Sequence, residues 1–296
     1  MPSTRRGAIT LAEERPRTGR ARTAGRLLVA AVVVGVLVAG YLGVRGMVDT
    51  FGGPKCQATA LGQSVTFTPE QMGNAATIVG IAMKRGLPAR AATIAVATSL
   101  QESKLRNIRY GDRDSVGLFQ QRPSQGWGTT KQILDPDYAT NAFYDELIKI
   151  HGYQGMDITK VAQRVQKSAF PEAYAEHEHE GRIIASAISG HSPRGLACRL
   201  DDAQKADRAA LLTSMKRELG VTGSESGSKV VVAARDAQQA WGVAAWTVAK
   251  ASNTGVVKVS VDGREWTRGQ SKGAWSWPAA KSSGSTATSV TISFAS

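Results

Sequence analysis

The sequence contains few cysteines and few histidines. Its 296 residues include two cysteines and four histidines, and no segment resembles a redox-active cysteine pair or a zinc-binding knuckle. Two histidines, His177 and His179, lie two positions apart in the run EHEHE. On a helix such positions point to different faces, so the pair is a poor chelate and a solvated charged face is favoured. We therefore predict no metal site and no cofactor.

Long hydrophobic runs are absent apart from one. Residues 27–44, LLVAAVVVGVLVAGYLGV, carry no charge and just reach the length of a membrane-spanning helix. Seven arginines lie in residues 1–26, and basic flanks stay on the cytoplasmic side. The pattern predicts a cytoplasmic tail (1–26), one transmembrane helix (27–44) and an extracytoplasmic body. A signal peptide cleaved near residues 38–40 is the alternative, and it also places the body outside the cytoplasm.

Acidic residues are in the minority. The chain carries 37 Lys and Arg against 24 Asp and Glu, a formal charge of +13. Leaving out the seven arginines and two glutamates of the tail, the exported part retains about +8. A basic body suits an anionic cell wall as partner, whereas the predicted compartment disfavours nucleic acid.

The two cysteines, Cys56 and Cys198, both lie in the predicted exported part. In an oxidising compartment they are expected to form a disulfide. In the chain-entropy description, a bond across so long a segment raises the free energy of the unfolded chain by about 5 kcal/mol, because it restricts that chain's conformations.

The exported part changes character along its length. Helix-start and helix-stop signals such as the capping pattern at Thr68 predict helices at residues 69–85, 88–102, 135–150, 157–168, 171–190 and 202–219. Residues 221–228 have the composition of a linker. A helix at 233–251, strands at 256–261 and 289–294 and a turn at Asp262-Gly263 are expected after it. The predicted fold is therefore mainly α: a transmembrane helix, an all-α domain (56–220) and a small α+β module (229–296).

Glu102 is the candidate catalytic residue. It ends a predicted apolar helix and precedes a polar loop at residues 107–128, so its carboxyl is expected where the core meets solvent. Cleavage of a glycosidic bond needs a carboxylic acid that protonates the leaving oxygen and has a pKa raised by a partly apolar setting. On periodicity alone, a solvated glutamate at a helix end is the simpler interpretation. The neighbouring motif favours catalysis.

An ES pair at Glu102, followed by GLFQ beginning at Gly117, resembles the signature of lytic transglycosylases and goose-type lysozymes. The wider stretch IAVATSLQESKLRNIRYGDRDSVGLFQQRPSQGWGT is similar to a set of actinobacterial lysozyme-like wall proteins. The resemblance implies a lysozyme-like domain with Glu102 as acid and base and Ser103 as its support. It places Gly117 where the backbone crosses close to the cleft, and Gln120 as a groove-lining amide. It further implies peptidoglycan glycan strands as substrate and a 1,6-anhydro sugar as product.

The sequence departs from the family pattern late in the domain. Family members carry a Tyr-Asn pair where this chain has VQKS at residues 165–168; Gln166 is the candidate amide, and the tyrosine has no counterpart there. Asp112 and Asp114 are candidates for a second carboxylate, with loop capping as the alternative. Without a second carboxylate, the substrate's N-acetyl oxygen attacks the anomeric carbon. With one, hydrolysis by an activated water competes.

Aromatic rings cover the apolar faces of sugars in many binding sites. Trp127 and Tyr110 are the candidate substrate contacts in the polar loop, whereas Phe119 is expected in the core. Arg122 is expected on the surface, with a bound stem-peptide carboxylate as the alternative.

The C-terminal segment offers a weaker resemblance. Its tryptophans and final strand look like the second half of a peptidase-like module of related wall proteins, whose last strand carries a metal motif of the Asp-His-Val-His type. Residues 289–292 contain neither His nor Asp, which implies a degenerate, non-catalytic module. The chain is accordingly predicted to be a peptidoglycan-cleaving lytic transglycosylase or muramidase. The alternative is a non-catalytic wall-binding or scaffold protein that retains the fold.

Overall fold

The computed structural model describes residue 40 and residues 53–166, 171–203, 205–280 and 286–295. The chain divides into two compact units, Met1–Gly52 and Gly53–Ser296. The predicted tail (1–26) and transmembrane helix (27–44) lie outside the described residues, except for Gly40. Among the helices that are described, none combines the length and the hydropathy needed to cross a membrane.

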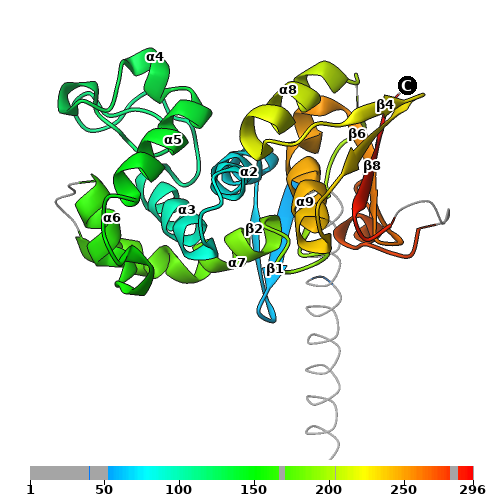
Figure 1. Cartoon of the computed structure of the whole chain (residues 1–296), viewed down its shortest axis with the longest axis horizontal. Helices are drawn as coiled ribbons and strands as arrows, with labels where there is room; N and C mark the ends of the chain where they lie inside the picture. Colours follow the sequence, from blue (N-terminus) through cyan, green and yellow to red (C-terminus); the bar gives the residue numbers. More distant parts are fainter. Residues whose placement is uncertain (1–39, 41–52, 167–170, 204, 281–285, 296) are drawn as a thin grey trace, which may run out of the picture. The chain divides into compact units, whose positions relative to one another are not determined.

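The described part of Gly53–Ser296 is a mixed α+β unit (Figure 1). It contains eight α-helices, α2 to α9, and two antiparallel sheets with three and five strands.

The first sheet corrects the prediction of an all-α domain over residues 56–220. Its strands are β1 (Lys55–Ala60), β2 (Gln63–Phe67) and β3 (Leu196–Arg199), with β1 in the middle. A hairpin turn at Leu61 and Gly62 joins β1 to β2, and both residues have positive φ, 55° and 73°. Two positive-φ residues match the twist of paired strands. The strands were missed because they are short and β2 is exposed or half-buried along its whole length, so it lacks an alternating pattern.

Cys56 on β1 and Cys198 on β3 form a disulfide, as predicted. The two residues are register partners in neighbouring strands, and their Cα atoms are 4.0 Å apart. The bond therefore closes the segment that runs from the first strand of this sheet to the last.

Most helices between β2 and β3 follow the predicted ones. The helix predicted at 171–190 is instead a 3₁₀ segment followed by a shorter α-helix, and the short helix at Thr130–Ile133 was not predicted. The helices of this segment are α2 (Pro69–Lys84), α3 (Ala89–Ser103), α4 (Thr130–Ile133), α5 (Pro136–Leu147), α6 (Ile158–Gln166) and α7 (Glu178–Ile188), with 3₁₀ turns η1 (Pro123–Gln125), η2 (Tyr153–Gly155) and η3 (Pro171–His177). The capping box predicted at Thr68 is present, because its side chain accepts from the Gln71 backbone while the Gln71 side chain accepts from the Thr68 backbone. Helix α3 is central and contacts α2, α5, α6, α7 and η3. The interior packing thus fixes the helix that carries Glu102.

The second sheet follows α8 (Arg208–Leu219) and has the order β4-β5-β8-β6-β7. Its strands are β4 (Ser224–Ser226), β5 (Lys229–Ala233), β6 (Val256–Val261), β7 (Arg264–Thr267) and β8 (Ser289–Phe294). Helix α9 (Ala237–Thr254) connects β5 to β6, and the 3₁₀ helix η4 (Lys272–Trp275) lies between β7 and β8. Strand β4 lies inside residues 221–228, which corrects the prediction of a linker there. The turn predicted at Asp262-Gly263 joins β6 to β7. Its two residues have φ values of 50° and 66°.

The segments predicted as domain and module pack against each other. Helix α9 contacts α2, α7 and α8, and the buried apolar side chains form one continuous core. Polar contacts cross the same junction: Lys250 on α9 donates to the hydroxyl of Thr77 on α2 (2.6 Å) and pairs with Glu218 on α8 (3.0 Å). The indole of Trp246 donates to Glu218 as well (2.8 Å). Both segments therefore belong to one compact unit.

Candidate functional site

Glu102 is half-buried and is the penultimate residue of α3. Burial raises the pKa of its carboxyl above the ordinary value, while hydrogen bonds from Tyr174 and Gln166 act in the opposite direction. Burial has the largest effect, because it penalises the ionised form. A glutamate in this setting retains its proton to a higher pH than a solvated one, as a general acid requires.

Tyr174 is the main polar partner of Glu102. Its hydroxyl donates to Oε1 of Glu102 at 2.6 Å, and the tyrosine is 1% exposed. It lies in η3, eight residues after Gln166, and was not among the predicted site residues. Residues 165–168 contain no tyrosine, yet η3 brings one to the carboxylate. The motif spacing could not reveal this tyrosine, because Tyr174 lies in η3 and not in the helix that contains Gln166.

Gln166 ends α6 and reaches the same place. Its side-chain amide donates to the backbone oxygen of Phe119 and is one of the two hydrogen-bonding groups that lower the pKa of Glu102. The predicted amide therefore connects the candidate acid with the GLFQ segment.

The chain leaves α3 through a turn of unusual conformation. Lys104 and Leu105 both have positive φ, 54° and 59°, which costs energy for residues other than glycine. The turn is held from α2, where Gln71 donates to the Lys104 oxygen and Asn74 to the Leu105 oxygen, each at 2.8 Å. Such strain persists where the surroundings determine the conformation. Here it redirects the chain directly after Glu102.

Ser103 holds the GLFQ segment against α3. Its hydroxyl donates to the Leu118 oxygen at 2.7 Å, and Ser99 donates to the same oxygen at 3.1 Å. Ser103 is 8% exposed and Phe119 is fully buried, stacked on Phe143 with ring centroids 4.7 Å apart. Ser103 thus fixes the loop against α3, and Phe119 lies in the core as expected.

Gly117 and Gln120 shape the same loop. Gly117 has φ of +82°, and a Cβ there would lie 2.7 Å from the backbone oxygen of Ile133, so only glycine fits. The amide of Gln120 donates to the backbone oxygens of Tyr110 (3.4 Å) and Gly117 (3.3 Å). Its contacts are therefore within the loop.

The two candidate second carboxylates have other partners. Asp114 accepts from Arg122 at 2.7 Å and from the Ser124 backbone at 2.8 Å, and these bonds hold the pKa of Asp114 well below its usual range. The side chain of Asp112 is 89% exposed and pairs weakly with Arg113. Neither aspartate is among the groups that shift the pKa of Glu102. Asp114 therefore fits the alternative interpretation, in which it caps the loop. Arg122 is the partner of Asp114 in this arrangement.

The two candidate aromatic contacts differ in exposure. Tyr110 is 76% exposed, whereas Trp127 is half-buried and packs on the core. Tyr110 is free to meet a ligand from solvent, and Trp127 presents only part of its ring.

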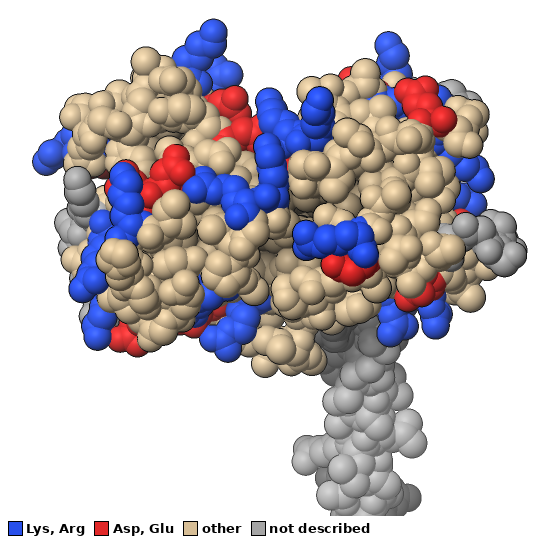
Figure 2. Space-filling view, viewed as in Figure 1, with Lys and Arg blue, Asp and Glu red and all other residues tan. Residues whose placement is uncertain are grey.

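The surface around this loop is basic. Lys104, Arg106, Arg109 and Arg113 follow Glu102 along the chain and are all exposed. The face shown in Figure 2 likewise carries more Lys and Arg than Asp and Glu side chains. A polyanion would be attracted to such a surface.

The histidines predicted not to bind metal have partners of other kinds. His177 pairs with Glu180 at 3.0 Å, and His179 bonds Gln63 of β2. Across the part of the chain that is described, no group of three or more His, Cys, Asp or Glu side chains is placed to hold a metal ion.

The sequence matches no protein-family model, and no curated protein matches it either.

Proposed function

We propose that this chain cleaves the glycan strands of peptidoglycan, as a lytic transglycosylase or muramidase with Glu102 as general acid and base. The observation that carries the proposal is the half-buried Glu102 carboxyl, which has a raised pKa and accepts a hydrogen bond from the buried Tyr174. The ES and GLFQ motifs support it, since both border this carboxyl. The predicted anchor places the activity on the outer side of the membrane, and the disulfide is consistent with that compartment.

The proposed reaction uses one carboxylate. Glu102 gives its proton to the glycosidic oxygen as the bond to the anomeric carbon breaks, and the N-acetyl oxygen of the same sugar bonds to that carbon. The Glu102 carboxylate then takes the proton of the C6 hydroxyl, whose oxygen displaces the N-acetyl oxygen and forms the 1,6-anhydro ring. The Tyr174 hydroxyl stabilises the carboxylate between the two steps. The placement of Asp112 and Asp114 favours this route over hydrolysis.

The second candidate is a non-catalytic wall-binding or scaffold protein. The observation in its favour is that Tyr174 and Gln166 both hydrogen-bond Glu102, because such a cluster can stabilise the fold without taking part in a reaction. This hypothesis predicts that the chain binds the wall and does not cleave it.

Activity on purified peptidoglycan separates the two candidates. The wild-type chain is expected to clear a wall-containing gel, and Glu102→Gln is expected to lose a hundredfold or more, roughly the share of general-acid catalysis. Glu70→Gln, the same change at an exposed helix residue, is the control and retains activity. Mass spectrometry of the products is expected to find anhydro ends, which lack the water gained in hydrolysis.

Three results would change the assignment. Binding of the wild-type chain to the wall without cleavage indicates the scaffold. Full cleavage by Glu102→Gln removes Glu102 from the mechanism. The mechanism is hydrolysis if the products carry reducing ends and Asp112→Asn or Asp114→Asn is inactive.

A further inference from the structure

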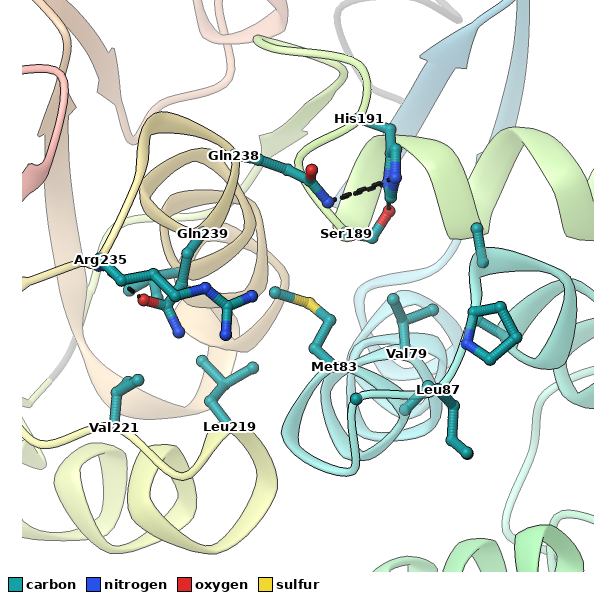
Figure 3. Close-up of a pocket in the computed structure, with 16 residues that line it drawn as sticks. Val79, Met83, Leu87, Ser189, His191, Leu219, Val221, Arg235, Gln238 and Gln239 are labelled. Atoms are coloured by element: carbon teal, nitrogen blue, oxygen red, sulfur yellow. Dashed lines mark hydrogen bonds between the residues drawn. The ribbon is translucent and has the colours of Figure 1, made fainter. Parts of the chain in front are cut away.

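A cavity of about 270 Å³ lies between α2, α8 and the first turns of α9 (Figure 3), and Glu102 does not line it. Its walls are apolar and come from parts of the chain far apart in sequence. The main apolar side chains are Val79, Met83, Leu87, Leu219, Val221 and Val243. Its volume is near the lower end for ligand sites, so it suits a small ligand or the end of a chain.

Polar groups stand on two sides of this cavity. Arg235 and Gln239 project over the wall formed by α8, and Ser189, His191 and Gln238 stand on the other side. The Ser189 hydroxyl lies 2.8 Å from Nδ1 of His191, and the amide of Gln238 lies 3.3 Å from the same ring. The cavity therefore has an apolar floor and hydrogen-bonding groups at separate points of its rim.

The donors at the rim are oriented by their other contacts. The backbone N–H of Arg235 donates to Oε1 of Gln239 (2.8 Å), which turns the amide nitrogen of Gln239 toward the cavity, as Figure 3 shows. Nε of Arg235 bonds Asp236 (3.0 Å), and the terminal guanidinium nitrogens extend over the opening. None of the described residues that line the cavity is Asp or Glu, but the Asp236 carboxylate is paired with Arg235 and balances its charge. The rim therefore offers a ligand the remaining N–H donors of Arg235 and Gln239, which complement an oxygen acceptor such as a carboxylate.

We propose that this cavity binds the carboxyl-terminal end of a short peptide with small apolar side chains. The guanidinium of Arg235 and the amide of Gln239 receive the carboxylate, because charge-assisted donors are the strongest partners for that group. Small side chains fill the apolar floor, and Gln238 and Ser189 serve the peptide groups. A fatty acid fits less well, since its single polar end leaves the groups on the other side of the rim without partners.

Met83 makes the cavity adaptable. Its side chain lies between the walls in Figure 3, and a Cβ on Gly242 of α9 would come within 2.4 Å of its terminal methyl. An unbranched thioether changes rotamer readily. Met83 is therefore expected to move on binding, and its methyl group reports occupancy.

The natural source of such a ligand rests on the proposed function. Peptidoglycan stem peptides end in alanine-type residues with a free carboxylate, so an enzyme of this substrate would meet the ligand at high local concentration. The cavity would then retain the chain on peptide-bearing strands. The binding chemistry itself needs no cleavage by Glu102.

Methyl NMR on the full-length chain in detergent tests the proposal with N-acetyl-D-alanyl-D-alanine as probe. The Met83 methyl signal, assigned through Met83→Leu, is expected to shift with saturable dependence on the peptide. Arg235→Gln is expected to weaken binding about tenfold, and Val221→Trp, which fills the cavity from a half-buried position, to abolish it. Arg109→Gln, the same change at an exposed arginine, binds like wild type.

Two further probes give the contradicting outcomes. Equal binding of the amide-capped peptide refutes carboxylate recognition, and binding of octanoate as tight as that of the peptide reassigns the cavity to acyl chains. No shift at Met83 with any probe overturns the site. The Glu102→Gln chain is expected to bind the peptide like wild type. A failure of peptide binding can therefore be distinguished from a failure of the glycan-cleaving function.

Discussion

At the scale of single residues, the site depends on a balance of opposing effects on one carboxyl. Burial raises the pKa of Glu102, and the Tyr174 hydroxyl, itself almost without solvent contact, lowers it. The balance permits one residue to donate a proton and then accept one. An acid buried without such a donor would be harder to ionise for the second step.

Tyr174→Phe is expected to raise the pKa of Glu102 further, because the ring still fills its place while the donor is lost. The pH profile of glycan cleavage should then move to higher pH, with a lower maximal rate. Tyr144→Phe is the control, since that hydroxyl donates to the Ile78 oxygen instead and its loss should affect stability alone. A Tyr174→Phe profile that stays in place or moves to lower pH would contradict the assigned contact.

At the scale of secondary-structure elements, the end of α3 stores conformational strain beside the site. Lys104 is exposed and has φ of 54°, a conformation that costs other residues about 1–2 kcal/mol relative to glycine. Lys104→Gly is expected to raise the free energy of unfolding by about 1 kcal/mol over Lys104→Ala, which removes the same charge but keeps the strain. Urea unfolding of the two variants measures the difference. Equal stabilities would mean that Gln71 and Asn74 do not impose this turn.

The elements differ in how far the sequence predicts them. Helices α2 and α3 follow from caps, proline and glycine, and β6 and β8 from alternating β-branched residues, because these signals are local. Strand β3 is four residues long and buried throughout, so it has neither length nor periodicity to reveal it. Of the side chains that meet at the candidate site, the sequence indicated Glu102 and Gln166. Tyr174 was missed because only packing of η3 on α3 brings it to a carboxylate 72 positions away.

At the scale of the whole molecule, buried charges gather where α5 and α8 lie beside the junction with α9. Asp137 on α5 is 7% exposed, and burial together with the nearby Glu218 raises its pKa to about 6 although Arg217 is paired with it. The Asp137 oxygens make an ion pair but no well-oriented hydrogen bond, which explains why the pairing does not offset burial. Ionisation of Asp137 therefore opposes folding.

The pH dependence of stability follows from that shift. A carboxyl with a pKa of 3.8 when unfolded and about 6 when folded favours the folded state below pH 4, and this contribution is lost as the pH rises to about 6. The loss is at most about 3 kcal/mol. Asp137→Asn is expected to flatten the dependence, so that wild type loses more stability than the variant between pH 4 and pH 6.5 in urea unfolding. A wild-type chain that gains stability relative to Asp137→Asn over this range would contradict the assignment.

The disulfide gives the body a definite response to mechanical load. Tension on the chain ahead of Gly53 enters at β1, reaches Cys56 and passes through the bond to Cys198, so the 142 positions between them bear none of it. The helices that hold Glu102 are thus mechanically shielded when the chain is pulled from the two sides of the bond. In a single-molecule pulling experiment, reductant should release about 480 Å of additional length, the extended span of that segment. Equal lengths with and without reductant would show that force reaches the helices directly.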